Sequence, residues 1–246
     1  MILEKQAAAN YLPVYDQKIL DLIYSGDVEQ ARWVAEESYE YSRTTYGDSH
    51  LETAKTLNNL AWVYDLLGYS KAAEACYKRA IELKISVCGQ RSTELIPSME
   101  NLMSLYLLNG DYKLAEKLLM EMINIVRNHP EPWCFREAVY LSRIAEINLK
   151  LGRINDADGF YHECIAFVER TLPLDHPNLG RAFANIADFY RQIGKFRRAE
   201  FYYMRAYAVL KRSLSVKHAD VQNVLEKIRE LRAQPQTLST TDSSTQ

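Results

Sequence analysis

The sequence predicts an all-α solenoid of antiparallel helix pairs, and three observations carry this prediction. A Gly-x-x-x-x-Ala pattern occurs five times with an unchanged spacing of 42 residues. Apolar residues recur three and four positions apart beside each glycine, which is the period of an α-helix. No stretch alternates apolar and polar residues over a length that would predict a β-sheet. The five glycines are Gly26, Gly68, Gly110, Gly152 and Gly194.

Each copy is predicted to be a helix, a glycine turn and a second helix. The glycine follows the first helix, where a left-handed residue costs little only if it has no Cβ. Small residues recur where two helices would cross closely, five positions after the glycine and seven before it in most copies. One such unit cannot bury its apolar face alone, so neighbouring copies must stack.

In chain order, we expect five repeats at about residues 8–46, 49–88, 92–130, 133–172 and 176–214. Pro97 predicts a late start or a kink in the third repeat, because proline lacks the backbone donor of a helix interior. Gly159 weakens the second helix of the fourth repeat. His176 and Pro177 begin the fifth repeat as an N-cap and a first helical residue. A single capping helix at about 218–232 and a disordered tail at 234–246 complete the chain.

The repeat resembles the tetratricopeptide repeat, and its longer unit is similar to that of kinesin light chains. The resemblance is carried by Leu57-Asn58-Asn59-Leu60-Ala61, Gly47-Asp48-Ser49-His50 and Leu174-Asp175-His176-Pro177. It covers roughly residues 8–232. It implies a right-handed superhelical solenoid, and because such arrays serve many partners it implies a binding role without naming the partner.

Composition argues against several other classes of protein. A formal net charge of −2 predicts no nucleic-acid partner, since that footprint needs a basic excess. The sequence shows no apolar run of transmembrane length and no secretory leader at its first residues. The spacing of Cys76, Cys88, Cys134 and Cys164 fits neither a zinc site nor a disulfide framework, so free thiols in the cytoplasm are expected. No catalytic or phosphate-binding motif occurs, so we predict a protein without enzymatic activity, cofactor or metal.

Three histidines recur at multiples of the repeat length. His50, His176 and His218 are separated by 126 and 42 residues. They could be read as metal or ligand contacts. Because each belongs to a different unit along the array, we interpret them as capping residues at helix starts.

The resemblance also implies that the first helices of the repeats line a concave groove. An asparagine offers two donors and one acceptor, so a ladder of asparagines could hold a peptide backbone of any sequence. Asn59, Asn101 and Asn185 stand nine residues before their glycines, and Arg143 takes that place in the fourth repeat. The alternative is that these side chains only bond to an adjacent helix. The full set of predicted partner-binding residues is Lys55, Asn58, Asn59, Trp62, Asn101, Arg143, Arg181, Asn185 and Asp188.

The function predicted from this groove is an adaptor that binds an extended peptide or partner segment. Lys55, Arg143 and Arg181 favour an acidic or carboxylate-bearing ligand. Trp62 is interpreted either as an aromatic anchor for a partner or as a core residue. Two alternatives remain: a subunit that forms a homo-oligomer within a larger assembly, and a peptide-sensing regulator that acts through a partner.

Overall fold

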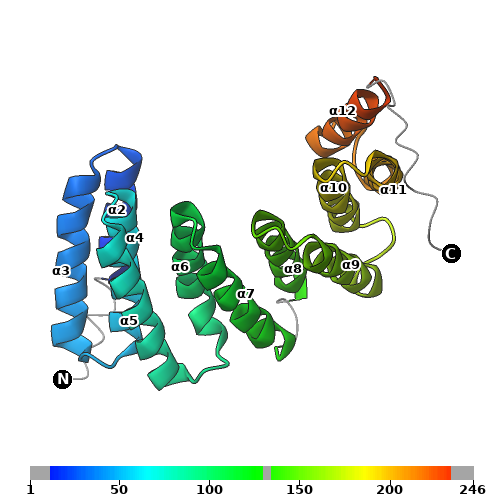
Figure 1. The fold of residues 1–246 in the computed structure, drawn as a ribbon. Coiled ribbons are helices and arrows are strands. Elements are labelled where there is room, and N and C mark those ends of the chain that lie inside the picture. Colours follow the sequence, from blue (N-terminus) through cyan, green and yellow to red (C-terminus); the bar gives the residue numbers. More distant parts are fainter. Residues whose placement is uncertain (1–11, 130–133, 234–246) are drawn as a thin grey trace. The chain divides into compact units, whose positions relative to one another are not determined.

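The computed structural model describes residues 12–129 and 134–233, and these residues form consecutive packed helix pairs (Figure 1). Eleven α-helices and one short 3-10 helix lie in these ranges, and no strand does. The all-α prediction is confirmed. The parts of the predicted first helix and of the tail that fall at residues 8–11 and 234–246 lie outside the described residues.

The chain divides into two compact units, Met1–Glu131 and Pro132–Gln246, which are described separately. The described helices of the first unit are α2 (Leu12–Tyr24), α3 (Val28–Tyr46), α4 (Leu51–Leu66), α5 (Ser70–Cys88), η1 (Thr93–Leu95), α6 (Ile96–Asn109) and α7 (Tyr112–Arg127). Those of the second unit are α8 (Cys134–Lys150), α9 (Ile154–Thr171), α10 (Pro177–Gln192), α11 (Phe196–Ser213) and α12 (Ala219–Ala233).

Glycine turns join the helices of each pair as the sequence predicts. Gly68 has φ +76° and Gly110 has φ +80°, in the left-handed region that side chains with a Cβ disfavour. The residue after each glycine donates its backbone N–H to the carbonyl five positions earlier, as Tyr69 does to Tyr64 at 2.8 Å and Asp111 does to Tyr106 at 2.8 Å. This bond closes the last turn of the first helix and satisfies a carbonyl that the helix leaves open.

The small-residue columns form the helix crossings. The alanine five residues after each repeat glycine has no exposed surface in any of the five copies. A larger side chain at this position would hold the two helices apart. These fully buried alanines are Ala31, Ala73, Ala115, Ala157 and Ala199.

Helix starts follow the expected caps. Nδ1 of His50, His176 and His218 each accepts a hydrogen bond from the backbone N–H two residues later, at 3.2 Å in all three cases. These histidines therefore cap helix N-termini, as interpreted from their spacing. Pro97 also acts as predicted: η1 precedes α6, and the α-helix begins only at Ile96.

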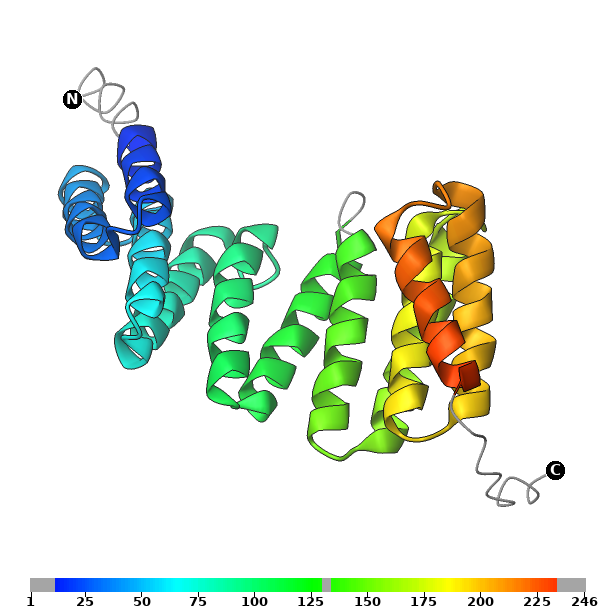
Figure 2. The same ribbon diagram turned by 90° about the horizontal axis from the view of Figure 1, so that it is seen from above.

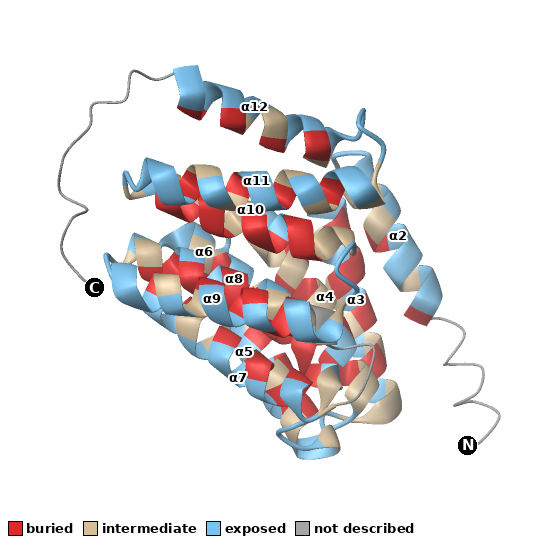
Figure 3. Cartoon of the chain, turned by 90° about the vertical axis from the view of Figure 1, so that its right-hand side faces the viewer, coloured by how far each residue is buried: buried red, intermediate tan, exposed pale blue. Residues whose placement is uncertain are grey.

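The last described helix, α12, covers the end of the second unit (Figure 2). Its buried residues lie on the side that faces α10 and α11, whereas its other side is exposed (Figure 3). They form one apolar stripe with helical spacing. The stripe consists of Val221, Val224, Ile228 and Leu231.

Two tyrosines at equivalent repeat positions differ in how their hydroxyl groups are satisfied. Both Tyr77 and Tyr203 are fully buried. Tyr203 donates to the Asp188 carboxylate, whereas the Tyr77 hydroxyl has no hydrogen-bond partner among the described residues. Burial raises the pKa of both phenols well above the usual value, so both stay neutral.

We therefore expect opposite effects from removing these two hydroxyls. Tyr203→Phe loses a bond to a charged group and is expected to lower the free energy of unfolding by about 1.5 kcal/mol. Tyr77→Phe removes an unsatisfied buried group and is expected to be neutral or to stabilise by up to about 1 kcal/mol. Urea unfolding followed by circular dichroism compares them. Equal losses for both variants would contradict the assignment.

Candidate functional site: the face of the first helices

A cavity of about 380 Å³ lies among α8, α9 and α10 in the second unit. Its floor is apolar and consists of Phe167 and Val168 from α9 and Ala182 from α10. All three side chains are buried. Val139 of α8 stands at the wall with 54% of its surface exposed, so the cavity opens to solvent past an apolar edge.

Polar side chains surround this apolar floor, and three of them are residues that the sequence predicted. Arg143 comes from α8, and Arg181 and Asn185 come from α10. Arg143 Nη1 lies 3.8 Å from Glu146 Oε2, and both side chains are about half exposed. Asn185 is half-buried, and its amide makes no hydrogen bond to any described residue. An apolar floor with a few polar groups is the usual composition of a ligand pocket.

The thiol of Cys164 also lines the cavity. Its Sγ lies 3.3 Å from the Ala138 carbonyl oxygen and 3.3 Å from Ser142 Oγ. Burial raises the pKa of this thiol, while the contact with Ser142 opposes the shift. A protonated thiol is a poor nucleophile, so Cys164 contributes lining rather than reactivity.

Side chains of α12 hold Arg181 and also Asp188, the remaining predicted residue of the second unit. Nη2 and Nε of Arg181 each lie 2.8 Å from Asp220 Oδ2. Asp188 Oδ2 lies 2.7 Å from Lys227 Nζ, and Asp188 Oδ1 accepts a hydrogen bond from the Tyr203 hydroxyl. Arg181 thus contributes to the cavity wall while paired, and Asp188 is already satisfied within the chain.

In the first unit, the predicted residues bond mainly to neighbouring helices. Asn59 Nδ2 donates to Asp16 Oδ1 of α2 at 2.7 Å, and Asn101 Nδ2 lies 3.4 Å from Asn58 Oδ1 of α4. Burial raises the pKa of Asp16, and the hydrogen bond from Asn59 opposes this. These contacts correspond to the structural alternative for the asparagine ladder.

The remaining two predicted residues of the first unit lie on α4. Lys55 Nζ pairs with Glu52 Oε1 at 2.8 Å on the same helix. Trp62 is half-buried, so it belongs neither to the closed core nor to the fully exposed surface. Both side chains therefore retain solvent-accessible surface on the face of α4 that the sequence assigned to the groove.

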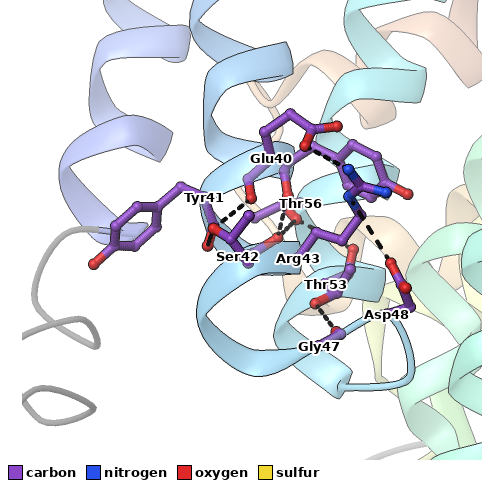
Figure 4. A network of polar contacts seen from close by, with 10 residues as sticks. Glu40, Tyr41, Ser42, Arg43, Gly47, Asp48, Thr53 and Thr56 are labelled. Carbon is purple, nitrogen blue, oxygen red and sulfur yellow. Dashed lines mark hydrogen bonds and ion pairs between the residues drawn. The ribbon is translucent and has the colours of Figure 1, made fainter.

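The floor residues Val168 and Ala182 occupy repeat positions that are polar in the first two repeats. The residues 84 positions before Val168 and Ala182 are Lys84 and Ser98, and Lys84 Nζ lies 2.8 Å from Ser98 Oγ in the first unit. A further 42 positions earlier stand Ser42 and Thr56, whose hydroxyl oxygens lie 2.6 Å apart (Figure 4). These positions thus hold bonded polar pairs in the first two repeats, whereas the later repeats carry the pairs Val126 and Tyr140, Val168 and Ala182, and Leu210 and Val224.

Sequence reasoning missed this apolar floor, although a signal for it was present. Val139 stands in the same repeat column as Lys55 and Arg181, and Val168 stands in the column of Lys84. A comparison of second-helix columns as well as first-helix columns would have found the change from polar to apolar residues.

Within the described ranges, no group of histidine, cysteine or carboxylate side chains could hold a metal ion. None of the helices described is both long and apolar enough to cross a membrane.

Comparison with known proteins adds a family and a set of folds. The sequence pattern of the tetratricopeptide repeat matches residues 14–86 and 136–212. A crystal structure of a putative kinesin light chain with nearly identical TPR-like repeats from Podosopora anserina is similar over 83% of this chain and 97% of its own, with 17% identity and a TM-score of 0.70. BtubC (BKLC) from P. vanneervenii is similar over 83% and 82%, with 18% identity and a TM-score of 0.64. MamA is similar over 85% and 96%, with 17% identity and a TM-score of 0.55. No curated protein matches.

Proposed function

Because this chain belongs to the tetratricopeptide repeat family, we propose that it binds an extended segment of a partner protein along the first helices of its repeats. Repeats of this family are a general scaffold for protein–protein interaction, and no enzymatic family is indicated. The observation that carries the proposal is the cavity among α8, α9 and α10, with Arg143, Arg181 and Asn185 at its wall.

The apolar floor supplies affinity in this proposal. Phe167, Val168 and Ala182 present apolar surface that one partner side chain can cover. Removal of apolar surface from water is worth about 25 cal/mol per Å². A single anchor in a desolvated pocket commonly dominates an interface of this kind.

The polar wall supplies orientation. The Asn185 amide makes no bond within the described chain, so its donors and acceptor are available to a peptide backbone. Arg143 is loosely paired with Glu146 and half exposed, so it can turn toward a carboxylate of the partner. Arg181 is held by Asp220 and keeps its place at the rim.

The experiment is a selection of random peptides on the full chain, followed by affinity measurement on purified variants. A selected peptide is expected to bind Arg143→Ala/Asn185→Ala at least about tenfold more weakly than wild type, which corresponds to about 1.4 kcal/mol. Isothermal titration calorimetry provides the dissociation constants.

The matched control is Asn155→Ala/Arg197→Ala. It removes the same two residue types from exposed positions on α9 and α11 that do not line the cavity. Wild-type affinity in this control, with loss in the cavity variant, supports the proposal. Equal affinities for all three proteins would place the binding surface elsewhere and refute it.

A further inference from the structure

A second recess, of about 560 Å³, lies in the first unit among α3, α4 and α5. It is separate from the face of the predicted groove residues. Leu57, Leu60 and Tyr64 of α4 form its base, and Tyr39 of α3 and Cys76 of α5 form its sides. Exposed charged side chains, including Glu40 and Arg79, stand at its rim.

The same repeat position is filled in the second unit. Three periods after Cys76 stands Tyr202, and three periods after Tyr64 stands Tyr190. These two rings are stacked, with centroids 5.6 Å apart and an interplanar angle of 15°. One period after Cys76 stands Leu118. Two periods after Cys76 stands Phe160. The position thus carries a bulky side chain in all three later repeats, whereas Cys76 leaves the space open.

Hydrogen bonds hold the Tyr64 ring at the base of the recess in place. The Tyr64 hydroxyl donates to Glu36 Oε1 at 3.1 Å, and Glu36 Oε1 in turn accepts from Arg32 Nη1 at 2.8 Å. Tyr190 is held similarly, by donation of its hydroxyl to Asp158 Oδ1 at 2.5 Å. Each tyrosine therefore presents a fixed face to the neighbouring second helix.

We propose that this recess binds an aromatic side chain presented by a partner protein, stacked on Tyr64 as Tyr202 stacks on Tyr190. The open rim with its exposed Glu40 and Arg79 suits a ring that remains attached to a polypeptide. Offset stacking of two rings is favoured by the quadrupoles of their π-systems. The recess lies in the first unit and the cavity above lies in the second, so the proposal does not depend on that cavity.

Cys76 fits the role of a small apolar wall. Its side chain is half-buried and burial raises the pKa of its thiol. The group therefore stays a neutral thiol and neither repels a ring nor attacks it. Its size is what sets the depth of the recess.

The test uses two probes on the isotopically labelled full chain, read by NMR shifts of backbone amides. One is p-cresol, the side chain of tyrosine alone, and the other is N-acetyl-tyrosine-N-methylamide, which carries a peptide group on each side. Both are expected to shift amides of α3, α4 and α5 in a saturable manner. In Cys76→Tyr, the new tyrosine ring should occupy the recess and lower the affinity for both probes at least tenfold.

The reverse variant is Tyr202→Cys, which opens the corresponding position in the second unit. It is expected to gain saturable shifts in α11, which does not line the cavity among α8, α9 and α10, and wild type is expected to lack these α11 shifts. Circular dichroism verifies that each variant is folded. If Cys76→Tyr fails to fold, Cys76→Leu takes its place in the test, because leucine occupies the equivalent repeat position at Leu118.

Three results would overturn the proposal. One is the absence of saturable binding by wild type. Another is equal binding by wild type and the filled variant. The third is binding of p-cresol without the tyrosine amide, which would assign the recess to a small free phenol rather than to a side chain of a protein.

Discussion

Gly180→Ala is expected to lower the free energy of unfolding by up to about 2 kcal/mol, although alanine is the better helix former. Gly180 is buried in α10, where α11 crosses it closely. A Cβ at this position would lie 2.6 Å from Leu210 Cγ and 2.8 Å from Leu210 Cδ2. Leu210 is only 1% exposed and cannot move into solvent. Overpacking costs about 1–3 kcal/mol, and subtracting the gain in helix propensity of about 1 kcal/mol leaves a net loss of up to about 2 kcal/mol.

Gly159→Ala is the matched control in the same unit. Gly159 lies within α9, is exposed, and has no atom within 4 Å of an added Cβ. The variant is expected to be more stable than wild type by about 1 kcal/mol. Urea unfolding of both variants and wild type measures the difference. If both variants changed the free energy of unfolding in the same direction, the close approach of α10 and α11 would not determine the effect of Gly180→Ala.

Lys84→Met/Ser98→Ala is expected to raise the free energy of unfolding at pH 7 by about 1–4 kcal/mol, the range seen when buried ionic groups are replaced by apolar residues of similar volume. Lys84 is 3% exposed and bonds to the neutral Ser98 hydroxyl. Burial lowers the pKa of the Lys84 ammonium, nearby Lys55 adds to the shift, and Glu94 opposes it. The methionine keeps the length of the side chain without its charge.

The advantage of this variant depends on pH. Below the folded-state pKa of Lys84, the lysine is protonated in both folded and unfolded chains, so the burial penalty is fully present. As pH rises through that value toward the unfolded-state pKa of about 10.4, the folded chain loses its proton first. Wild type therefore gains stability relative to the variant as the solution becomes alkaline. Urea unfolding at several pH values between neutral and alkaline measures the difference.

The equivalent pair Ser42 and Thr56 provides the control, because neither hydroxyl titrates (Figure 4). Ser42→Ala/Thr56→Val is expected to change stability by the same amount at every pH within this range. A flat pH dependence for the Lys84 variant as well would mean that Lys84 is not a destabilised ammonium in the folded chain.

The repeated helix pairs and their turns follow from the sequence alone. The spacing of Gly68 and Gly110 requires a left-handed turn at one place in each repeat, and Ala73 and Ala115 mark the close crossings. The capping role of His50 follows from its position before a helical pattern. These features depend on backbone geometry and on burial that recurs every 42 residues, so they can be predicted from one sequence.

The packing of the helices, in contrast, is needed to tell which polar side chains already have partners. Asn59 bonds to Asp16, 43 residues earlier, and Arg181 bonds to Asp220, 39 residues later. Asn185 belongs to the same repeat column as Asn59 but lines a cavity instead. Residue type does not separate these cases, because each contact depends on side chains of a neighbouring repeat. Exposed pairs of this kind contribute about 1 kcal/mol or less to stability. They therefore leave no periodic pattern in the sequence, whereas the apolar residues that helices bury in the core recur with the repeat.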